Sequence, residues 1–112
     1  MLNNSINLVN PLVFLDLAST ELDLNKARIV RISTIKILPD STKIFVTNLI
    51  NPQEKISKHA TKIHGINQKM IENEKPFSNY AESISKHLSG CDIVGFGIKR
   101  YSLPLLRKEF RK

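Results

Sequence analysis

The sequence has no tryptophan, a single cysteine and few aromatic side chains, which make up 6% of its 112 residues. The lone Cys91 excludes an internal disulfide, and no cysteine–histidine cluster has the spacing of a zinc site. The longest apolar run near the amino terminus is Leu12–Leu15, and the first basic side chain is Lys26. We therefore expect neither a membrane span nor a secretory leader. These absences favour a reduced, cytoplasmic protein.

What the sequence does contain is a globular share of apolar residues and an excess of basic ones. Hydrophobic residues make up 41% and charged residues 24%, which suits one folded domain. The formal net charge is +7. Between residues 99 and 112, Glu109 is outnumbered by basic residues: Lys99, Arg100, Arg107, Lys108, Arg111 and Lys112. This tail either attracts a phosphate backbone or is a solvated helix end whose cations offset the helix dipole.

The first half of the chain has the pattern of strands. Residues 1–10 are rich in asparagine and predict a flexible lead-in, so the domain itself is expected over 11–112. The apolar run 12–17 predicts a buried strand. Residues 29–38 and 43–50 are rich in β-branched side chains and predict two more strands. Only a short Pro-Asp-Ser turn separates them, so we expect these two to pair as a hairpin.

The second half has the pattern of helices around one further strand. Short helices are expected over 57–63 and 67–74, with Gly65 between them as a terminator. A longer helix, ending at Gly90, is predicted by apolar residues on one face: Phe77, Tyr80, Ala81, Ile84 and Leu88. Residues 92–96 then predict a second buried strand.

The last helix is expected to begin at Ser102 as its cap. Its apolar stripe would be Leu103, Leu106 and Phe110. The element order is therefore β-β-β-α-β-α. Because a helical crossover joins parallel strands, the sequence predicts an α/β fold with a mixed sheet, in which strands one to three are antiparallel and the fourth is parallel.

Several segments, in this order and spacing, resemble the DEDD 3′–5′ exonuclease superfamily, which includes ribonuclease T and the ε subunit of DNA polymerase III. Val13–Asp23 and Arg28–Ser33 are similar to its opening motif. Leu49–Pro52 with Ala60–Ile66 is similar to the segment after the hairpin in the ε-like branch, and Asp92–Leu106 to the second motif. The resemblance implies a ribonuclease H-like fold and a nuclease. It also implies a pair of Mg²⁺ or Mn²⁺ ions that are held by four carboxylates.

Residue by residue, the sequence departs from that metal-binding pattern. Asp16 matches the first aspartate of the family, but Ala18 stands at its glutamate position. In the second motif Gly97 replaces a common asparagine and Ser102 replaces an aspartate. The third motif, the fifth strand and the last helix are expected to be missing, because the sequence ends at Lys112. We therefore expect Asp16 to be the one retained ligand and any metal to be bound weakly.

Neighbouring residues of the two motifs carry the other expectations. By the resemblance, nucleic acid would be contacted by Ser19, Thr20, Gly97, Lys99 and Arg100. Glu21 and Asp23 follow the first strand in a loop and are not expected to replace the lost ligands. Arg31 stands where the family often has glutamate, and the sequence offers no explanation for it.

The remaining polar and aromatic residues have structural interpretations. His64 is expected to bind the last carbonyls of its helix, whereas His59 and His87 are expected to be exposed. Cys91 is expected to be a small buried residue beside the fourth strand. The expected aromatic core is Phe14, Phe45, Tyr80, Phe96 and Tyr101.

Three functions remain open at this point. The first is an inactive exonuclease-like domain that still binds single-stranded nucleic acid through Lys99, Arg100 and their neighbours. The second is an active exonuclease that a partner chain completes. The third is an inactive remnant or protein-interaction piece, which self-associates through an exposed sheet edge.

Overall fold

The computed structural model describes residues 9–95 and 101–111. The expected lead-in up to residue 8 lies outside this part of the chain, and so do Phe96, Gly97, Lys99 and Arg100. Within the described residues, no helix is long and apolar enough to cross a membrane.

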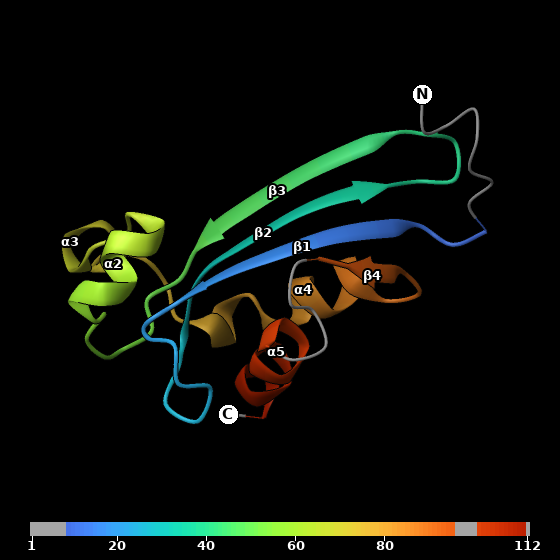
Figure 1. The fold of residues 1–112 in the computed structure, drawn as a ribbon. Coiled ribbons are helices and arrows are strands. Elements are labelled where there is room, and N and C mark those ends of the chain that lie inside the picture. Colours follow the sequence, from blue (N-terminus) through green and yellow to red (C-terminus); the bar gives the residue numbers. More distant parts are fainter. Residues whose placement is uncertain (1–8, 96–100, 112) are drawn as a thin grey trace.

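A four-stranded mixed sheet forms the centre of the fold, as Figure 1 shows. Its strands are β1 (Leu12–Ser19), β2 (Ile29–Ile37), β3 (Lys43–Leu49) and β4 (Asp92–Val94), in the spatial order β3-β2-β1-β4. The first three are antiparallel, and β4 runs parallel to β1. The predicted fold class and the predicted hairpin are both confirmed. The described part of β4 pairs only with Leu12–Phe14, so it reaches less than half of β1.

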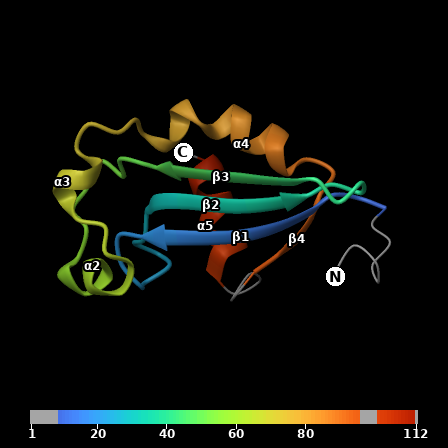
Figure 2. The ribbon, with the colours of Figure 1, turned by 90° about the horizontal axis from the view of Figure 1, so that it is seen from above.

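The helices lie on one face and at one end of this sheet (Figures 1 and 2). α4 (Ala81–Leu88) and α5 (Leu103–Phe110) cover one face, while α2 (Lys58–His64) and α3 (Gln68–Ile71) lie at the end where β1 finishes. The helix expected over 77–88 is divided. It begins as a 3-10 turn, η1 (Phe77–Asn79), before α4 starts at Ala81.

Local capping explains where α2 and α3 begin and where α2 ends. The Ser57 side chain accepts a hydrogen bond from the Ala60 amide at the start of α2, and Gly65 ends that helix at φ 76°. Gly65 suits this left-handed position because it has no Cβ. The Asn67 side chain caps α3 in the same way as Ser57. Ser102 does not act as predicted, because its backbone is already helical and its side chain makes no capping bond.

Two apolar clusters hold the elements together. The larger one joins the covered face of the sheet to α4 and α5, through residues such as Leu15, Ile32, Ile84 and Leu105. The aromatic rings of Phe77 and Phe110 also meet edge to face at 5.2 Å, which links η1 to α5. The smaller cluster fastens α3 and the segment before it to the end of the sheet and consists of Ala18, Val30, Ile66 and Ile71.

The other face of the sheet is not covered by any described element, and this corrects two expectations for the core. Phe14 is 40% and Phe45 is 70% exposed, because both side chains point to this open face. The buried apolar face of α5 also differs from the expected one. Leu105 and Leu106 are its buried apolar residues, whereas Phe110 is 39% exposed.

The residues around the end of α4 also differ from expectation. His87 is half-buried instead of exposed, and its Nε2 lies 3.0 Å from the Thr34 hydroxyl. Burial, together with the charge of Lys36, lowers the pKa of His87. Lys36 also donates a hydrogen bond to the His87 carbonyl, so β2 and α4 are joined by polar contacts. Cys91 is only partly buried, because it follows the helix in a turn at the surface.

A buried carboxylate fixes α5 to the sheet. Glu109 is 3% exposed and accepts hydrogen bonds from Arg28 Nε at 2.9 Å, Arg28 Nη2 at 3.0 Å and the Ile29 amide at 2.9 Å. The hydrogen bond to Glu109 is the main cause that raises the pKa of Arg28. The preceding residue, Lys108, donates to the carbonyls of Leu24, Asn25 and Ala27. At least this basic residue of the tail therefore holds a loop instead of forming a solvated cationic surface.

Candidate functional site

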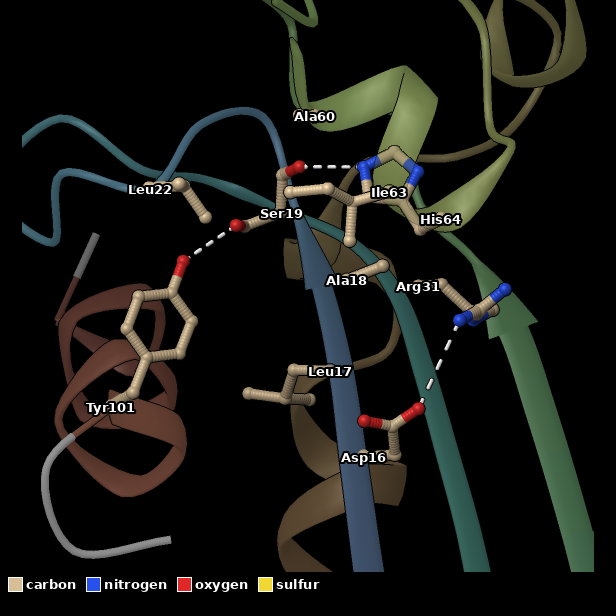
Figure 3. Close-up of a pocket in the computed structure, with 10 residues that line it drawn as sticks. All are labelled: Asp16, Leu17, Ala18, Ser19, Leu22, Arg31, Ala60, Ile63, His64 and Tyr101. Carbon is tan, nitrogen blue, oxygen red and sulfur yellow. Dashed lines mark hydrogen bonds and ion pairs between the residues drawn. The ribbon is translucent and has the colours of Figure 1, made fainter. Parts of the chain in front are cut away.

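A hollow of about 280 Å³ lies at the carboxyl-terminal end of β1, where the family resemblance places the site. Figure 3 shows its walls: β1 and the neighbouring Arg31 form the floor, α2 one side, and Tyr101, which precedes α5, the other. Leu22 and Ile63, which are about 60% exposed, add apolar surface to the lining. The residues that line it are Asp16, Leu17, Ala18, Ser19, Leu22, Arg31, Ala60, Ile63, His64 and Tyr101.

Asp16 is the one acidic residue in this lining, and its nearest charge is a cation of the protein. Its carboxylate is 76% exposed, and Arg31 Nη2 lies 3.9 Å from Asp16 Oδ2. At that distance the two groups attract each other electrostatically but are not hydrogen-bonded. The Arg31 side chain is 28% exposed, and its Nε is buried without an acceptor among the described residues. The guanidinium therefore has unused donors at the floor of the hollow.

Strand register explains how Arg31 comes to lie there. Ala18 on β1 is paired directly with Arg31 on β2. Cross-strand neighbours point to the same face of a sheet, so the arginine extends over the short Ala18 side chain towards Asp16. Ala18 itself is 4% exposed and belongs to the smaller apolar cluster. The position that carries a glutamate in the family pattern is thus a core position here.

Ser19 and Thr20, two of the residues expected to contact nucleic acid, make internal hydrogen bonds. The Ser19 hydroxyl donates to the Glu21 carbonyl and shares a hydrogen bond with the Tyr101 hydroxyl. Thr20 is 1% exposed, and its hydroxyl accepts from the Arg28 amide. Both residues therefore shape the turn after β1, and Ser19 also forms part of the lining. Their contact with nucleic acid stays a prediction.

His64 has a role that the sequence did not reveal. Its Nδ1 accepts a hydrogen bond from the Ile66 amide at 3.1 Å, which places the ring proton on Nε2. Nε2 then donates to the Ser19 carbonyl at 2.9 Å (Figure 3). His64 was expected to serve its own helix end, but it joins α2 to the end of β1 and so fixes one wall of the hollow.

Ser102, which was expected to replace an aspartate of the family pattern, is 4% exposed at the start of α5. It does not line the hollow, although the adjacent Tyr101 does. Glu21 and Asp23, which were not expected to replace a ligand, are outside the lining as well. The Asp23 carboxylate accepts a hydrogen bond from the Asn25 amide within its own loop.

The residues present do not fit a pair of divalent ions. Such a centre needs several convergent oxygen ligands, whereas the described lining offers the Asp16 carboxylate and opposes it with the Arg31 guanidinium. In the part of the chain that the structure describes, no three acidic, histidine or cysteine residues are grouped to hold a metal. A divalent ion about 5 Å from a unit positive charge is repelled by about 1.7 kcal/mol even at the dielectric constant of water.

Comparison with known proteins agrees with the motif order. The RNase_T family model, described as Exonuclease, matches residues 13–112. The chain belongs to this exonuclease family. Among curated proteins, the 3′-5′ exonuclease DinG of Bacillus subtilis is 28% identical over 85 residues, which cover 76% of this chain and 9% of that protein.

Solved structures of exonuclease I share the fold. E. coli exonuclease I in complex with a dT13 oligonucleotide superposes with a TM-score of 0.79 at 16% identity, over 91% of this chain and 24% of that one. The moderately thermophilic exonuclease I from Methylocaldum szegediense gives 0.79 at 20% identity, over 89% and 23%. The chain therefore spans about a quarter of the length of these structures, and the fold is what they have in common.

Proposed function

We propose that this exonuclease-family domain binds single-stranded nucleic acid and does not hydrolyse it by the two-metal mechanism. The observation that carries the proposal is the floor of the hollow, where Arg31 faces Asp16 across Ala18. A carboxylate pair at 16 and 18 would concentrate negative charge there, as two divalent ions require. The residues present give about equal positive and negative charge instead.

Loss of metal-dependent chemistry follows from this charge balance. One exposed carboxylate leaves Mg²⁺ or Mn²⁺ with mostly water ligands, so binding is weak. In the two-metal mechanism the ions activate the attacking water and stabilise the leaving oxygen. Without tightly bound ions, neither effect assists hydrolysis of a phosphodiester. His64 does not serve as a base here, since one ring nitrogen accepts from Ile66 and the other donates to Ser19.

Two independent observations support nucleic-acid binding: the net charge of the chain and a ligand of a structural relative. The net charge of +7 favours contact with a phosphate backbone. A structural relative holds a dT13 oligonucleotide. We assign nucleic-acid contacts to Ser19, Thr20, Gly97, Lys99 and Arg100, as the family motifs imply, and a cytoplasmic location to the protein.

The test combines a nuclease assay with a binding assay on the same labelled oligothymidylate. We expect salt-sensitive binding, and no release of nucleotides with Mn²⁺. Asp16→Ala is the control, because it removes the one acidic ligand of the lining. Nucleotide release that Asp16→Ala abolishes would show an active exonuclease, and binding that is absent or insensitive to salt would show that the domain is not a nucleic-acid module.

The open face of the sheet favours a second candidate, a protein-interaction piece that self-associates. Phe14, Ile35 and Phe45 are 37–70% exposed on this face, where they line a shallow groove with Asp16 and Thr47. Exposed apolar groups in one groove are typical of interaction surfaces. Concentration-dependent oligomers in light scattering, lost in Phe45→Ser, would establish this function; a monomer at high concentration would exclude self-association.

A further inference from the structure

We infer that the Arg31 guanidinium binds a phosphate group of the strand directly, so that nucleic-acid binding in this domain is independent of divalent metal. This inference rests on the proposed function and adds the group that holds the ligand. A protein cation would then stand beside Asp16, where the family pattern requires metal ions.

Arg31 has unused hydrogen-bonding capacity. A guanidinium has five N–H donors in a planar fork that matches phosphate oxygens. None of the described residues accepts a hydrogen bond from Arg31, and Asp16 at 3.9 Å is beyond hydrogen-bond distance. Donors that are partly removed from water and left unpaired favour an anionic ligand, because such a ligand restores their hydrogen bonds.

Arg31 is also accessible from the hollow. It lines the hollow on the Asp16 side of β1, across the strand from Tyr101 (Figure 3), and its side chain is 28% exposed. Nε is buried, whereas the side chain as a whole is 28% exposed, so the exposed part of the fork is its outer end. Ala18 makes this possible, since a longer side chain opposite Arg31 would fill the space that the arginine crosses.

Asp16 does not prevent phosphate binding. Its carboxylate is 76% exposed and therefore well hydrated, so its interaction with Arg31 is weak. The two groups together also explain why a divalent ion gains little here: the attraction of one carboxylate is opposed by the adjacent guanidinium. A phosphate group is attracted on balance, because the Arg31 guanidinium that attracts it is less hydrated and better placed than the Asp16 carboxylate that repels it.

The experiment measures fluorescence anisotropy of a labelled oligothymidylate with the full chain, once in EDTA and once in millimolar Mg²⁺. We expect equal affinities in the two buffers. Arg31→Gln should weaken binding about tenfold in both, which is the worth of one charge-assisted hydrogen bond. It should also reduce the slope of log affinity against log salt by about 0.7. Lys86→Gln on the distant helix α4 removes the same charge and should change neither quantity.

Amide spectra of each variant establish that it is folded. If Arg31→Gln unfolds, Arg31→Lys keeps the charge but loses the fork, and it should weaken binding by a smaller factor. Binding that requires Mg²⁺, or that Arg31→Gln and Lys86→Gln affect equally, would overturn the Arg31 inference and leave the proposed nucleic-acid binding intact.

A second probe separates the two proposals if the oligonucleotide does not bind at all, which would remove the proposed function. Thymidine monophosphate is then added in EDTA while the Nε–H signal of Arg31 is followed by NMR. This proton is buried and therefore protected from rapid exchange. A saturable shift of this signal supports a phosphate site at Arg31, and an unmoved signal refutes it.

Discussion

The buried carboxylate of Glu109 should be one of the most important single side chains for the stability of this domain. It accepts hydrogen bonds from Arg28 and from the Ile29 amide, and it is 3% exposed. Glu109→Gln keeps the shape of the side chain but removes its charge. The new amide NH₂ group also faces N–H groups that need an acceptor. Breaking a buried ion pair in this way costs about 3–5 kcal/mol. Because the Arg28 side chain is 19% exposed and can regain water, we expect a value near the lower end, about 3 kcal/mol.

Urea denaturation measures this loss. With a slope of about 1.5 kcal/mol per molar urea, a loss of about 3 kcal/mol lowers the midpoint by about 2 M. The matched control is Glu82→Gln on α4, which breaks an ion pair with Lys86 at 3.2 Å whose side chains are 84% and 77% exposed. That change should cost less than about 0.5 kcal/mol. If Glu109→Gln shifts the midpoint no further than Glu82→Gln does, the buried pair does not anchor α5.

Four further outcomes follow from the structure. Burial lowers the pKa of His87, so protonation favours the unfolded chain; stability should fall as pH drops below about 6.5, and His87→Gln should flatten this dependence in denaturation curves measured across pH. Gly65→Ala should cost about 1 kcal/mol, since φ is 76° but the added Cβ meets no atom, and a midpoint equal to wild type would contradict this. Lys108→Met should destabilise by about 1–2 kcal/mol while oligonucleotide affinity is unchanged, because three carbonyls lose their donor; weaker binding by the folded variant would count against a purely structural role. Ala18→Glu puts a second carboxylate beside Asp16, at a position that is 4% exposed and paired with Arg31; in the folded variant the guanidinium offsets the added charge, so Mn²⁺ should broaden the amide signals near residue 18 no more than in the wild type.

The order of elements was predictable because it depends on local signals. Hydrophobic alternation, the Pro-Asp-Ser turn and the terminator Gly65 each act within a few residues. The mixed sheet then follows from the rule that a helical crossover joins parallel strands. These predictions are confirmed by the strand order β3-β2-β1-β4.

The burial of individual side chains was less predictable, because it depends on which face another element covers. Phe14 and Phe45 are large apolar residues of the type that usually forms a core, but they point to the open face of the sheet. Glu109 and His87 are polar, so periodicity assigns them to solvent, yet tertiary partners far along the chain bury them. Only the pairing of Thr34 with His87, or of Arg28 with Glu109, could have revealed this, and such pairs have no local signature.

The candidate site likewise has a part that the sequence predicts and a part that only the folded sheet determines. Asp16 and Ala18 could be placed on one strand from the motif alone, and their two-residue spacing puts them on one face. The position of Arg31 could not be derived, because it depends on the register between β1 and β2 and on the irregularity between Ala18 and Ser19. A shift of one residue would have turned the arginine to the opposite face. The cation beside Asp16 is therefore a property of the folded sheet.

The proposed function implies a fold that does not depend on metal-binding carboxylates. Carboxylates that converge on metal ions repel one another when no metal is bound, so replacing them by small side chains relieves that repulsion. Ala18 does more than that, since it packs with Val30, Ile66 and Ile71. The ion pair that the architecture does need, Glu109 with Arg28, lies outside the hollow. Stability and metal chemistry therefore depend on different residues, which is consistent with the proposal that the domain binds nucleic acid without hydrolysing it.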